Sequence, residues 1–459
     1  MDGEHHPPVV RAAIEHLPTR APGAVVVGAA LIGGEEKLAG PDHPDLGIPV
    51  VSGATPDEAL AAGLEAFSPD LVYDLSDEPV LDARSRLRLA ARALAAGVAY
   101  AGADFRLDPP PRPRLATKPS VAVIATGKRT GKTAVSSSLA RLLAERGTPP
   151  VIVAMGRGGP PDPETIDPAS ADLSPRGLLA LADSGRHAAS DHLEDAVMAG
   201  VATVGTRRCG GGLVGAPVDD TFAAGVELAN ARPEPLLVLE GSGAAIPPVH
   251  ADATVLVVPA TADPELVTGY LGAHRVLLSD LVVVTMAEQS FADSGAAVSV
   301  EGVAPAASIV DLEKSVRGLA PGVKVVHAVL RPFPLEPISG RRVFYVTTAP
   351  ASAMSTMVGH LEREHGCKVV GTSPHLAHRP QLAEDLEGLD AADILVVELK
   401  AAAVDLAVRV ALERGMEVTF CDNRVVSTGG DATFDELALT TADVAIGRFG
   451  QPNSATRIS

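Results

Sequence analysis

The chain has 459 residues, of which 46% are hydrophobic and 3% aromatic, and its formal net charge is −19. This length allows about three domains, and the acidic balance argues against nucleic acid or an anionic membrane as a partner. No apolar run approaches the ~20 residues of a membrane span, and the N-terminus lacks the apolar core of an export signal. The 3 cysteines, Cys209, Cys367 and Cys421, lie too far apart to indicate a disulfide framework or a zinc site. We therefore expect a cytoplasmic protein.

Residues 1–118 have the pattern of a small Rossmann-like α/β domain. Short apolar runs typical of strands fall at 24–27, 49–51, 71–73 and 98–100, and helical patterns fall at 56–67 and 82–96. The proline-rich run at 108–113 fits neither a helix nor a central strand and predicts a stiff connector. We place the first domain boundary after this connector.

Residues 119–335 and 336–459 each repeat strand and helix patterns. In the first segment, strands are expected at 121–124, 151–155, 202–204, 236–240, 253–258 and 281–285, with helices after 132 and at 175–182 and 221–231. In the second, strands are expected at 343–347, 367–372, 394–398 and 417–421, with helices at 352–365, 401–414 and 434–438. Alternating strands and helices predict a mainly parallel sheet covered on both faces. The predicted fold is α/β, with a central domain flanked by smaller N-terminal and C-terminal α/β domains.

The sequence T-G-K-R-T-G-K-T at 126–133 has the form and context of a phosphate-binding P-loop. It follows a β-branched apolar run and opens a helix, although its first position is Thr126 instead of the usual glycine. Gly127 and Gly131 would let the backbone turn so that its N–H groups point at phosphate oxygens. Lys132 would reach the β- and γ-phosphates.

An acidic residue, Glu240, ends the apolar strand expected at 236–240. An acid at this position holds Mg²⁺ in P-loop enzymes, together with the hydroxyl that follows the P-loop lysine, which here is Thr133. The residues expected to bind the nucleotide are Gly127, Thr130, Gly131, Lys132, Thr133, Ala134, Glu240 and Gly241. Residues 285–288 read T-M-A-E and lack the lysine and aspartate that read guanine, which favours ATP over GTP.

Basic residues cluster at the turns that follow the expected strands of the central domain. Because the carboxyl ends of parallel strands meet at one edge of a sheet, these turns can share one crevice. Such a cationic crevice in an acidic protein predicts a small, strongly anionic substrate that is phosphorylated. The candidate catalytic residues are Lys132, Lys128, Arg129, Arg157, Arg207, Arg208 and His192. Glycines 210–212 would let the loop with Arg207 and Arg208 wrap closely around one phosphate.

Several segments carry a family resemblance when taken together. They read G-K-R-T-G-K-T-A-V at 127–135, G-R-G-G-P at 156–160, S-D-H-L-E-D-A at 190–196, R-R-C-G-G-G at 207–212 and E-G-S-G-A-A-I-P-P at 240–248. These motifs resemble the cyclic 2,3-diphosphoglycerate synthetase family, and the E-G-S-G piece is also similar to dethiobiotin synthetases. The resemblance implies an ATP- and Mg²⁺-dependent enzyme that closes 2,3-bisphosphoglycerate into an intramolecular phosphoanhydride and releases ADP and phosphate. It also implies K⁺ dependence and a homodimer.

Two other classes stay open at this point. One is a different ATP-dependent ligase or kinase that acts on another small anionic acceptor, such as a carboxylate. The other is an ATPase switch of the partitioning type. Those switches carry a signature lysine five residues before the P-loop lysine, where this chain has Gly127, and no basic amphipathic helix closes the chain.

Overall fold

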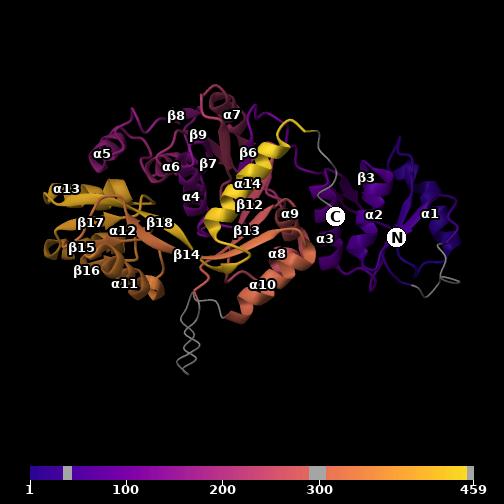
Figure 1. Cartoon of the computed structure of the whole chain (residues 1–459). Coiled ribbons are helices and arrows are strands. Elements are labelled where there is room, and N and C mark those ends of the chain that lie inside the picture. Colours follow the sequence, from indigo (N-terminus) through magenta and orange to yellow (C-terminus); the bar gives the residue numbers. More distant parts are fainter. Residues whose placement is uncertain (35–43, 289–305, 452–459) are drawn as a thin grey trace.

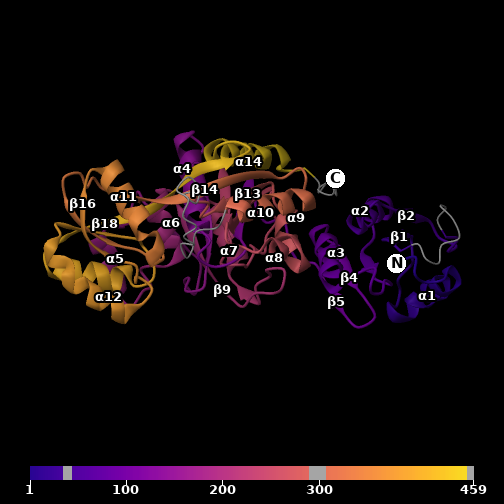
Figure 2. The same ribbon diagram turned by 90° about the horizontal axis from the view of Figure 1, so that it is seen from below.

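The computed structural model describes residues 1–34, 44–288 and 306–451 as three α/β parts arranged in a row. Figure 1 shows the N-terminal part at one end, the P-loop part in the middle and the C-terminal part at the other end. The view from below gives the same order (Figure 2). In the described residues, no helix is both long and apolar enough to cross a bilayer.

The N-terminal part contains two small sheets and three helices in the described residues. Its elements are α1 (Pro7–Arg20), β1 (Ala29–Leu31), β2 (Val50–Ser52), α2 (Pro56–Phe67), β3 (Leu71–Tyr73), α3 (Ala83–Ala95), β4 (Ala99–Ala101) and β5 (Arg106–Leu107). The helix predicted at 56–67 is confirmed as α2. Thr55 caps its first turn by accepting a hydrogen bond from the Glu58 amide, and Ser68 ends the helix in a left-handed conformation. The strand predicted at 24–27 is wrong, since the first strand is Ala29–Leu31. An apolar run alone does not fix where a strand finds a partner.

The P-loop part and the C-terminal part share one sheet. Within the described residues this sheet has 13 strands, and its main path runs β10-β9-β7-β11-β6-β12-β13-β14-β18-β17-β15-β16. The P-loop part contributes β6 (Ser120–Ala125), β7 (Pro150–Gly156), β8 (Glu164–Ile166), β9 (Thr203–Cys209), β10 (Asp219–Asp220), β11 (Leu236–Glu240), β12 (Ala253–Pro259), β13 (Leu281–Thr285) and β14 (Lys324–Pro334). The strands from β9 to β14 on this path pair in parallel, so the predicted α/β class with a mainly parallel central sheet is confirmed.

Helices cover the central sheet on both faces. They are α4 (Lys132–Glu145), α6 (Asp191–Ala199), α7 (Phe222–Asn230), α8 (Pro264–Thr268), α9 (Ala273–Leu277) and α10 (Ala306–Leu319), with a 3₁₀ turn η1 (Tyr270–Gly272). Helix α5 (Pro175–Asp183) instead packs on the C-terminal part. Residues of β6 alternate between two cores. Val121 and Val123 pack with α4 and α14 (Phe434–Arg448), whereas Ala122 and Ile124 pack toward α7 and α9. Burial on both faces, worth ~1.5–3 kcal/mol for each large side chain, fixes the strand that carries the P-loop.

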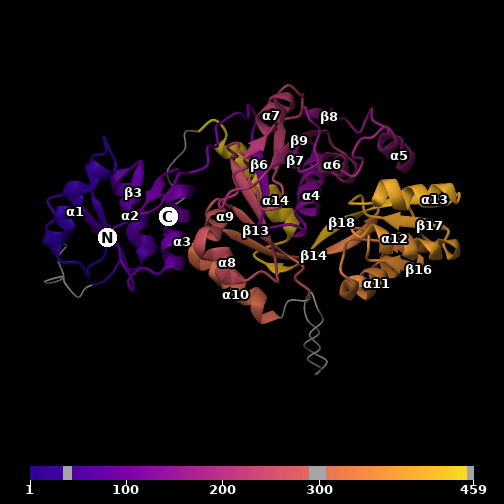
Figure 3. The ribbon, with the colours of Figure 1, turned by 180° about the vertical axis from the view of Figure 1, so that it is seen from behind.

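The C-terminal part continues the sheet through an antiparallel pair. β14 pairs with β18 (Glu417–Gly430), and β17 (Ile394–Val397), β15 (Arg342–Val346) and β16 (Lys368–Ser373) follow in parallel. The helical segments of this part are η3 (Ala351–Ala353), α11 (Met354–His365), α12 (Arg379–Asp385), η4 (Leu386–Ala391), η5 (Ala403–Val408) and α13 (Arg409–Glu413). The last helix, α14, begins at a capping box of Thr433 and Glu436 and returns to pack on the P-loop part. Figure 3 shows this return from behind.

Candidate nucleotide and phosphate site

The P-loop lies between β6 and α4 at the carboxyl edge of the sheet. Gly131 has a φ of +86°, and a Cβ there would come within 2.8 Å of Leu330, so this position requires glycine. Arg129 also has a positive φ, of +57°. The loop is anchored from the neighbouring strands, because the Thr285 hydroxyl donates to the Thr130 carbonyl at 2.6 Å. Gly127 has open space around it, and Ala134 is buried in the first turn of α4.

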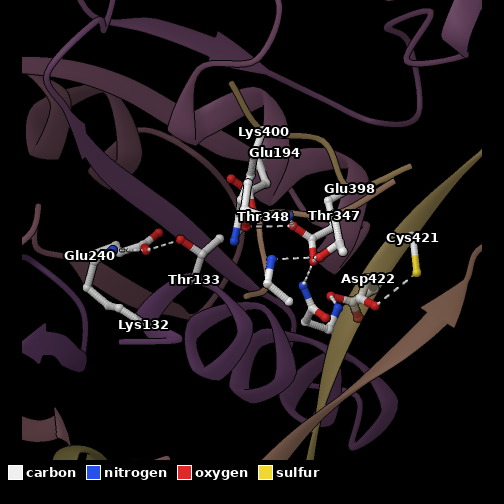
Figure 4. Close-up of polar contacts among 12 residues, drawn as sticks. Lys132, Thr133, Glu194, Glu240, Thr347, Thr348, Glu398, Lys400, Cys421 and Asp422 are labelled. Carbon is white, nitrogen blue, oxygen red and sulfur yellow. Dashed lines mark hydrogen bonds and ion pairs between the residues drawn. The ribbon is translucent and has the colours of Figure 1, made fainter. Parts of the chain in front are cut away.

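Lys132 and Thr133 both reach Glu240 (Figure 4). The Lys132 ammonium forms an ion pair with Glu240 Oε1, and the Thr133 hydroxyl donates to the same oxygen at 3.3 Å. Glu240 is 1% exposed at the end of β11, which pairs directly with β6. A Cβ at the next residue, Gly241, would lie 2.5 Å from the Ala245 carbonyl, so the chain turns sharply there. The structure thus brings the P-loop lysine, its hydroxyl neighbour and the strand-end acid together.

Helix α6 adds carboxylates that the sequence analysis did not assign to the site. Asp195 is fully buried beside Glu240, and Asp191 is close enough to feel the charges of Lys132 and Glu240. Buried acids break the usual amphipathic pattern of a helix, so the motif at 190–196 does not by itself predict that these carboxylates face the site. The sequence does contain a signal for the helix itself. Leu193 and Ala196 have helical spacing, and Gly200 ends the helix in a left-handed conformation.

The charges of these carboxylates are coupled. Burial alone would raise the pKa of Glu240, but Lys132 and the hydrogen bonds from Lys132 and Thr133 lower it. Burial and the Glu240 charge raise the pKa of Asp195 well above its ordinary value. Burial also raises the pKa of Asp191 and that of Glu194, although the Lys400 ammonium opposes the shift at Glu194 by favouring its ionised form. The surroundings therefore favour the ionised form of Glu240 and the protonated form of Asp195.

The residues around Thr133 fit a hard divalent cation. Both carboxylate oxygens of Asp195 and Oε2 of Glu240 are buried without a hydrogen-bond donor. In the described part of the chain, no group of three or more His, Cys, Asp and Glu side chains is arranged to hold a metal. One hydroxyl and two carboxylates nevertheless match Mg²⁺, which keeps several waters and takes phosphate oxygens as further ligands.

Three of the predicted cations converge beside the P-loop. A Cβ at Gly243, whose φ is +56°, would meet Arg157 Nη2 at 2.7 Å, Arg208 Nη2 at 3.6 Å and Lys128 Cγ at 3.6 Å. Arg208 donates to the Ser242 carbonyl at 2.7 Å, while burial and the charge of Arg157 lower its pKa. Among the described residues, no carboxylate forms an ion pair with Lys128, Arg157 or Arg208. Like charges gathered without an ion-pair partner suit a bound anion.

Other predicted cations lie apart from this cluster. Arg207 and Arg129 are exposed, as are Lys128 and Arg157, but neither Arg207 nor Arg129 is among the nearest side chains that a Cβ at Gly243 would meet. Arg207 neighbours Arg208 on β9, where successive side chains point to opposite faces. His192 is buried at the start of α6, where its Nε2 lies 3.0 Å from Glu164 Oε1. Glu164 also pairs with Arg186, so His192 belongs to a separate network. Burial lowers the pKa of His192 and favours its neutral form.

Comparison with known proteins covers the chain in three consecutive matches. Models of the N-terminal domain, the P-loop domain and the C-terminal domain of cyclic 2,3-diphosphoglycerate synthetase match residues 1–108, 120–325 and 334–424. Cyclic 2,3-diphosphoglycerate synthetase of Rubrobacter xylanophilus is 46% identical over 95% of this chain and 96% of its own length. The proteins of that name from Methanothermobacter thermautotrophicus and Methanothermus fervidus are 42% and 40% identical, each over 98% of this chain and 96% and 97% of their own lengths.

Solved structures give a weaker likeness. LpxK from Aquifex aeolicus, crystallised with ATP, is 12% identical with a TM-score of 0.36, over 72% of this chain and 90% of LpxK. The family matches are much stronger than this structural likeness, since they extend through all three parts of the fold and include the P-loop. The chain is an enzyme of the cyclic 2,3-diphosphoglycerate synthetase family.

Proposed function

We propose that this chain uses ATP to close 2,3-bisphosphoglycerate into cyclic 2,3-diphosphoglycerate, with release of ADP and phosphate. The observation that carries the proposal is the position of Lys128, Arg157 and Arg208 around Gly243, next to a P-loop whose lysine meets Glu240. The γ-phosphate of a nucleotide and a polyanionic acceptor would thus be bound side by side. The names of the relatives supply the identity of the acceptor.

The nucleotide end of the site rests on Lys132 and the loop amides. Lys132 exchanges Glu240 for the β- and γ-phosphates, and the amides of the loop and the N-terminus of α4 bind phosphate oxygens. Thr133, Glu240 and Asp195 would hold Mg²⁺, which neutralises the charge that develops on the transferred phosphoryl group. Burial beside Glu240 favours the protonated form of Asp195, and a metal ligand must be deprotonated, so metal affinity should rise with pH.

The acceptor end rests on the cations. One phosphate of 2,3-bisphosphoglycerate attacks the γ-phosphorus of ATP in line, and ADP leaves. An oxygen of the second phosphate then attacks the phosphorus of the first, inorganic phosphate leaves, and the P–O–P bond closes the ring. A phosphate is already a nucleophile, so the protein need only hold two mutually repelling groups together against the cations. The bidentate donors of Arg157 and Arg208 suit that task.

The nucleotide is proposed to be ATP. Glu288 stands where a guanine-reading aspartate would lie, and its carboxylate is engaged with Arg331 at 2.8 Å. Titration calorimetry with ATP and GTP tests this preference, and tighter binding of GTP would contradict it.

We also predict four further properties for this chain. They are K⁺ dependence, a homodimer, a cytoplasmic location and functional domains at 1–118, 119–335 and 336–459. K⁺ dependence is tested by replacing K⁺ with Na⁺ in the assay, and the dimer by sedimentation equilibrium. Limited proteolysis tests the boundaries, with one expected exception: α14 should stay with the P-loop part, because Phe434 and Leu437 are buried in its core.

The proposed reaction is tested by acceptor-dependent ATP turnover. Purified protein is given ATP, Mg²⁺ and one candidate acceptor at a time, including 2,3-bisphosphoglycerate, its monophosphate analogues and a dicarboxylate. Formation of ADP and phosphate in equal amounts only with the bisphosphate supports the proposal. A preference for a carboxylate acceptor would favour a ligase of another specificity, and turnover without any acceptor would favour an ATPase switch.

A further inference from the structure

Lys400 comes from the C-terminal part but lies at the nucleotide site. It follows β17, which ends at Val397 and pairs in parallel with β15 and β18. Open α/β sheets bind their ligands at the carboxyl ends of such strands. Here this edge of the C-terminal part faces the P-loop part, and Figure 4 shows Lys400 and Glu194 between Thr133 on one side and Glu398 on the other.

The contact is an ion pair between the two parts. Lys400 Nζ lies 3.3 Å from Glu194 Oε1, and the side chains are 32% and 9% exposed. Glu194 belongs to α6, the helix that presents Asp191 and Asp195 to Lys132 and Glu240. Lys400 also lines the same cavity of about 10 Å³ as Thr133 and Ala134. A space of this size holds about one water, so the ammonium is within a water's reach of the P-loop helix.

Glu398 fixes the other side of Lys400. Its Oε1 accepts the Thr347 hydroxyl at 2.6 Å and the Asn423 amide at 2.9 Å. Its Oε2 accepts the Thr348 amide at 2.9 Å and hydroxyl at 2.8 Å. These bonds hold the Glu398 carboxylate rigidly without Lys400. Burial opposes the charge of Lys400, but Glu194 of α6 and Glu398 of the C-terminal part outweigh it and raise the Lys400 pKa, so the ammonium lies between the two acids (Figure 4).

A contribution to the stability of the fold does not by itself explain the Lys400–Glu194 pair. A half-buried lysine and a buried glutamate lose hydration that their attraction only partly offsets, and an apolar pair often serves as well. The same two parts are also joined at the surface, where Arg409 of α13 meets Asp183 of α5 at 2.5 Å. The surface pair supplies a contact between the parts without approaching the P-loop.

We propose that Lys400 is a positioning residue for the reaction, which the C-terminal part supplies to hold Glu194, and with it α6, at the metal-binding carboxylates. The substrate named in this inference comes from the proposed function, whereas the contact between Lys400 and Glu194 is independent of it. Leu193 and Met198 of α6 pack into the core of the C-terminal part, and the pair adds the polar contact that orients the face of α6 with Asp191 and Asp195. The side chain acts through α6 and does not itself contact the reacting atoms.

The test compares Lys400→Met, Glu194→Gln, the double variant and Lys400→Arg with Arg409→Met as the matched control. Steady-state assays give kcat and KM for ATP and 2,3-bisphosphoglycerate, and calorimetry gives the gain in ATP affinity on adding Mg²⁺. Loss of a residue that orients metal ligands typically costs ~10–100-fold in activity or metal affinity. We expect Lys400→Met to lower kcat by ~10-fold or more with little change in the KM for ATP, and to reduce the Mg²⁺ gain.

The other variants separate positioning from stability. Adding Glu194→Gln to Lys400→Met should cause little further loss, because both remove one interaction. Lys400→Arg should restore most of kcat, and Arg409→Met should leave kcat and the Mg²⁺ gain near wild type. If Lys400→Met does not fold, Glu194→Gln must still lower kcat and Lys400→Arg must retain it. Wild-type kcat in Lys400→Met or in Glu194→Gln, or multiplied losses in the double variant, would overturn the inference.

The two proposals fail in different ways. If the wild-type protein forms no cyclic product, the proposed function is wrong, and Lys400 is judged by the Mg²⁺ gain in ATP affinity alone. A gain that falls in Lys400→Met and not in Arg409→Met then supports the positioning role. An equal gain in both variants and the wild type would reject it.

Discussion

Lys132 and Glu240, which are 108 residues apart in the chain, form an ion pair where two adjacent parallel strands end. The same carboxylate oxygen accepts the Thr133 hydroxyl. Glu240 therefore occupies the lysine and the hydroxyl that a bound nucleotide and its metal require. Binding must exchange this pair for phosphate and Mg²⁺, which makes Glu240 both the partner of Lys132 and a candidate metal ligand.

Replacing Glu240 by Gln should remove metal-dependent turnover and leave the fold intact. The amide keeps the shape of the side chain but loses the charge that Mg²⁺ needs, and a loss of ~10²–10³-fold or more in kcat is expected for a site group of this kind. Turnover is measured over a range of Mg²⁺ concentrations, with circular dichroism as the control for folding. An unfolded variant with no selective loss of activity would instead make Glu240 a structural charge of the strand edge.

Arg207 and Arg208 offer a comparison between adjacent residues of the same type. Arg208 lies against Ser242 and Gly243 beside Arg157, whereas Arg207 is the next residue along β9 and points to the opposite face. Arg208→Ala should weaken kcat/KM for the acceptor by ~1.5–3 kcal/mol, the range for a lost charge-assisted hydrogen bond. ATP affinity should hardly change, and Arg207→Ala should stay near wild type. If Arg208→Ala weakened ATP binding equally, this loop would belong to the nucleotide and not to the acceptor.

Gly243 can be tested against a glycine outside the site. Gly243→Ala places a methyl group 2.7 Å from Arg157 Nη2, and the φ of +56° adds strain. Gly147 has a φ of +84° with nothing within 4 Å, so Gly147→Ala carries strain alone. Both variants should lose ~1–2 kcal/mol of stability, measured by urea unfolding. Only Gly243→Ala should raise the KM for the acceptor, because only it displaces a cation. An unchanged KM would separate Arg157 from acceptor binding.

Stability should fall in acid partly through His274. This residue is 1% exposed in α9, and burial together with Arg112 lowers its pKa from 6.5 to about 3. Between these values the unfolded chain binds a proton that the folded protein does not, so the free energy of unfolding rises with pH there. The contribution is fully present above about pH 6.5 and is lost as the pH falls toward 3, by up to ~1.4 kcal/mol per pH unit.

The measurement compares urea unfolding at pH 7.5 and 5.5. His274→Gln should flatten the difference between the two pH values, while His16→Gln, on the exposed side of α1, should keep it. A wild-type pH dependence in His274→Gln would show that other groups account for the acid sensitivity.

The sequence predicted the part of the site that depends on local motifs. The P-loop and Glu240 are recognised from short patterns, and β6, α4 and β11 lie where they were expected. Whether Arg207 and Arg208 point to the same side depends on where the strand before them ends. The strand predicted at 202–204 continues to Cys209, and side chains alternate along it, so Arg207 and Arg208 point apart.

The remainder depends on contacts between distant segments. Asp195 stands out only once α6 is packed beside β11, and Lys400 only once the C-terminal part is placed against that helix. The strand predicted at 417–421 runs on to Gly430, since its second half pairs with β14 and joins two domains in one sheet. Neither periodicity nor propensity specifies such a partner.

The most direct test of the proposed reaction is phosphorus NMR of the product that the protein forms from ATP, Mg²⁺ and 2,3-bisphosphoglycerate. Both monoester signals of the acceptor should disappear in favour of two mutually coupled phosphoanhydride signals, with ADP and inorganic phosphate formed in equal amounts. Lys132→Ala should give none of this product, because the γ-phosphate loses its main cation. ADP formation with the monoester signals unchanged, or a linear product that keeps a monoester, would contradict the account.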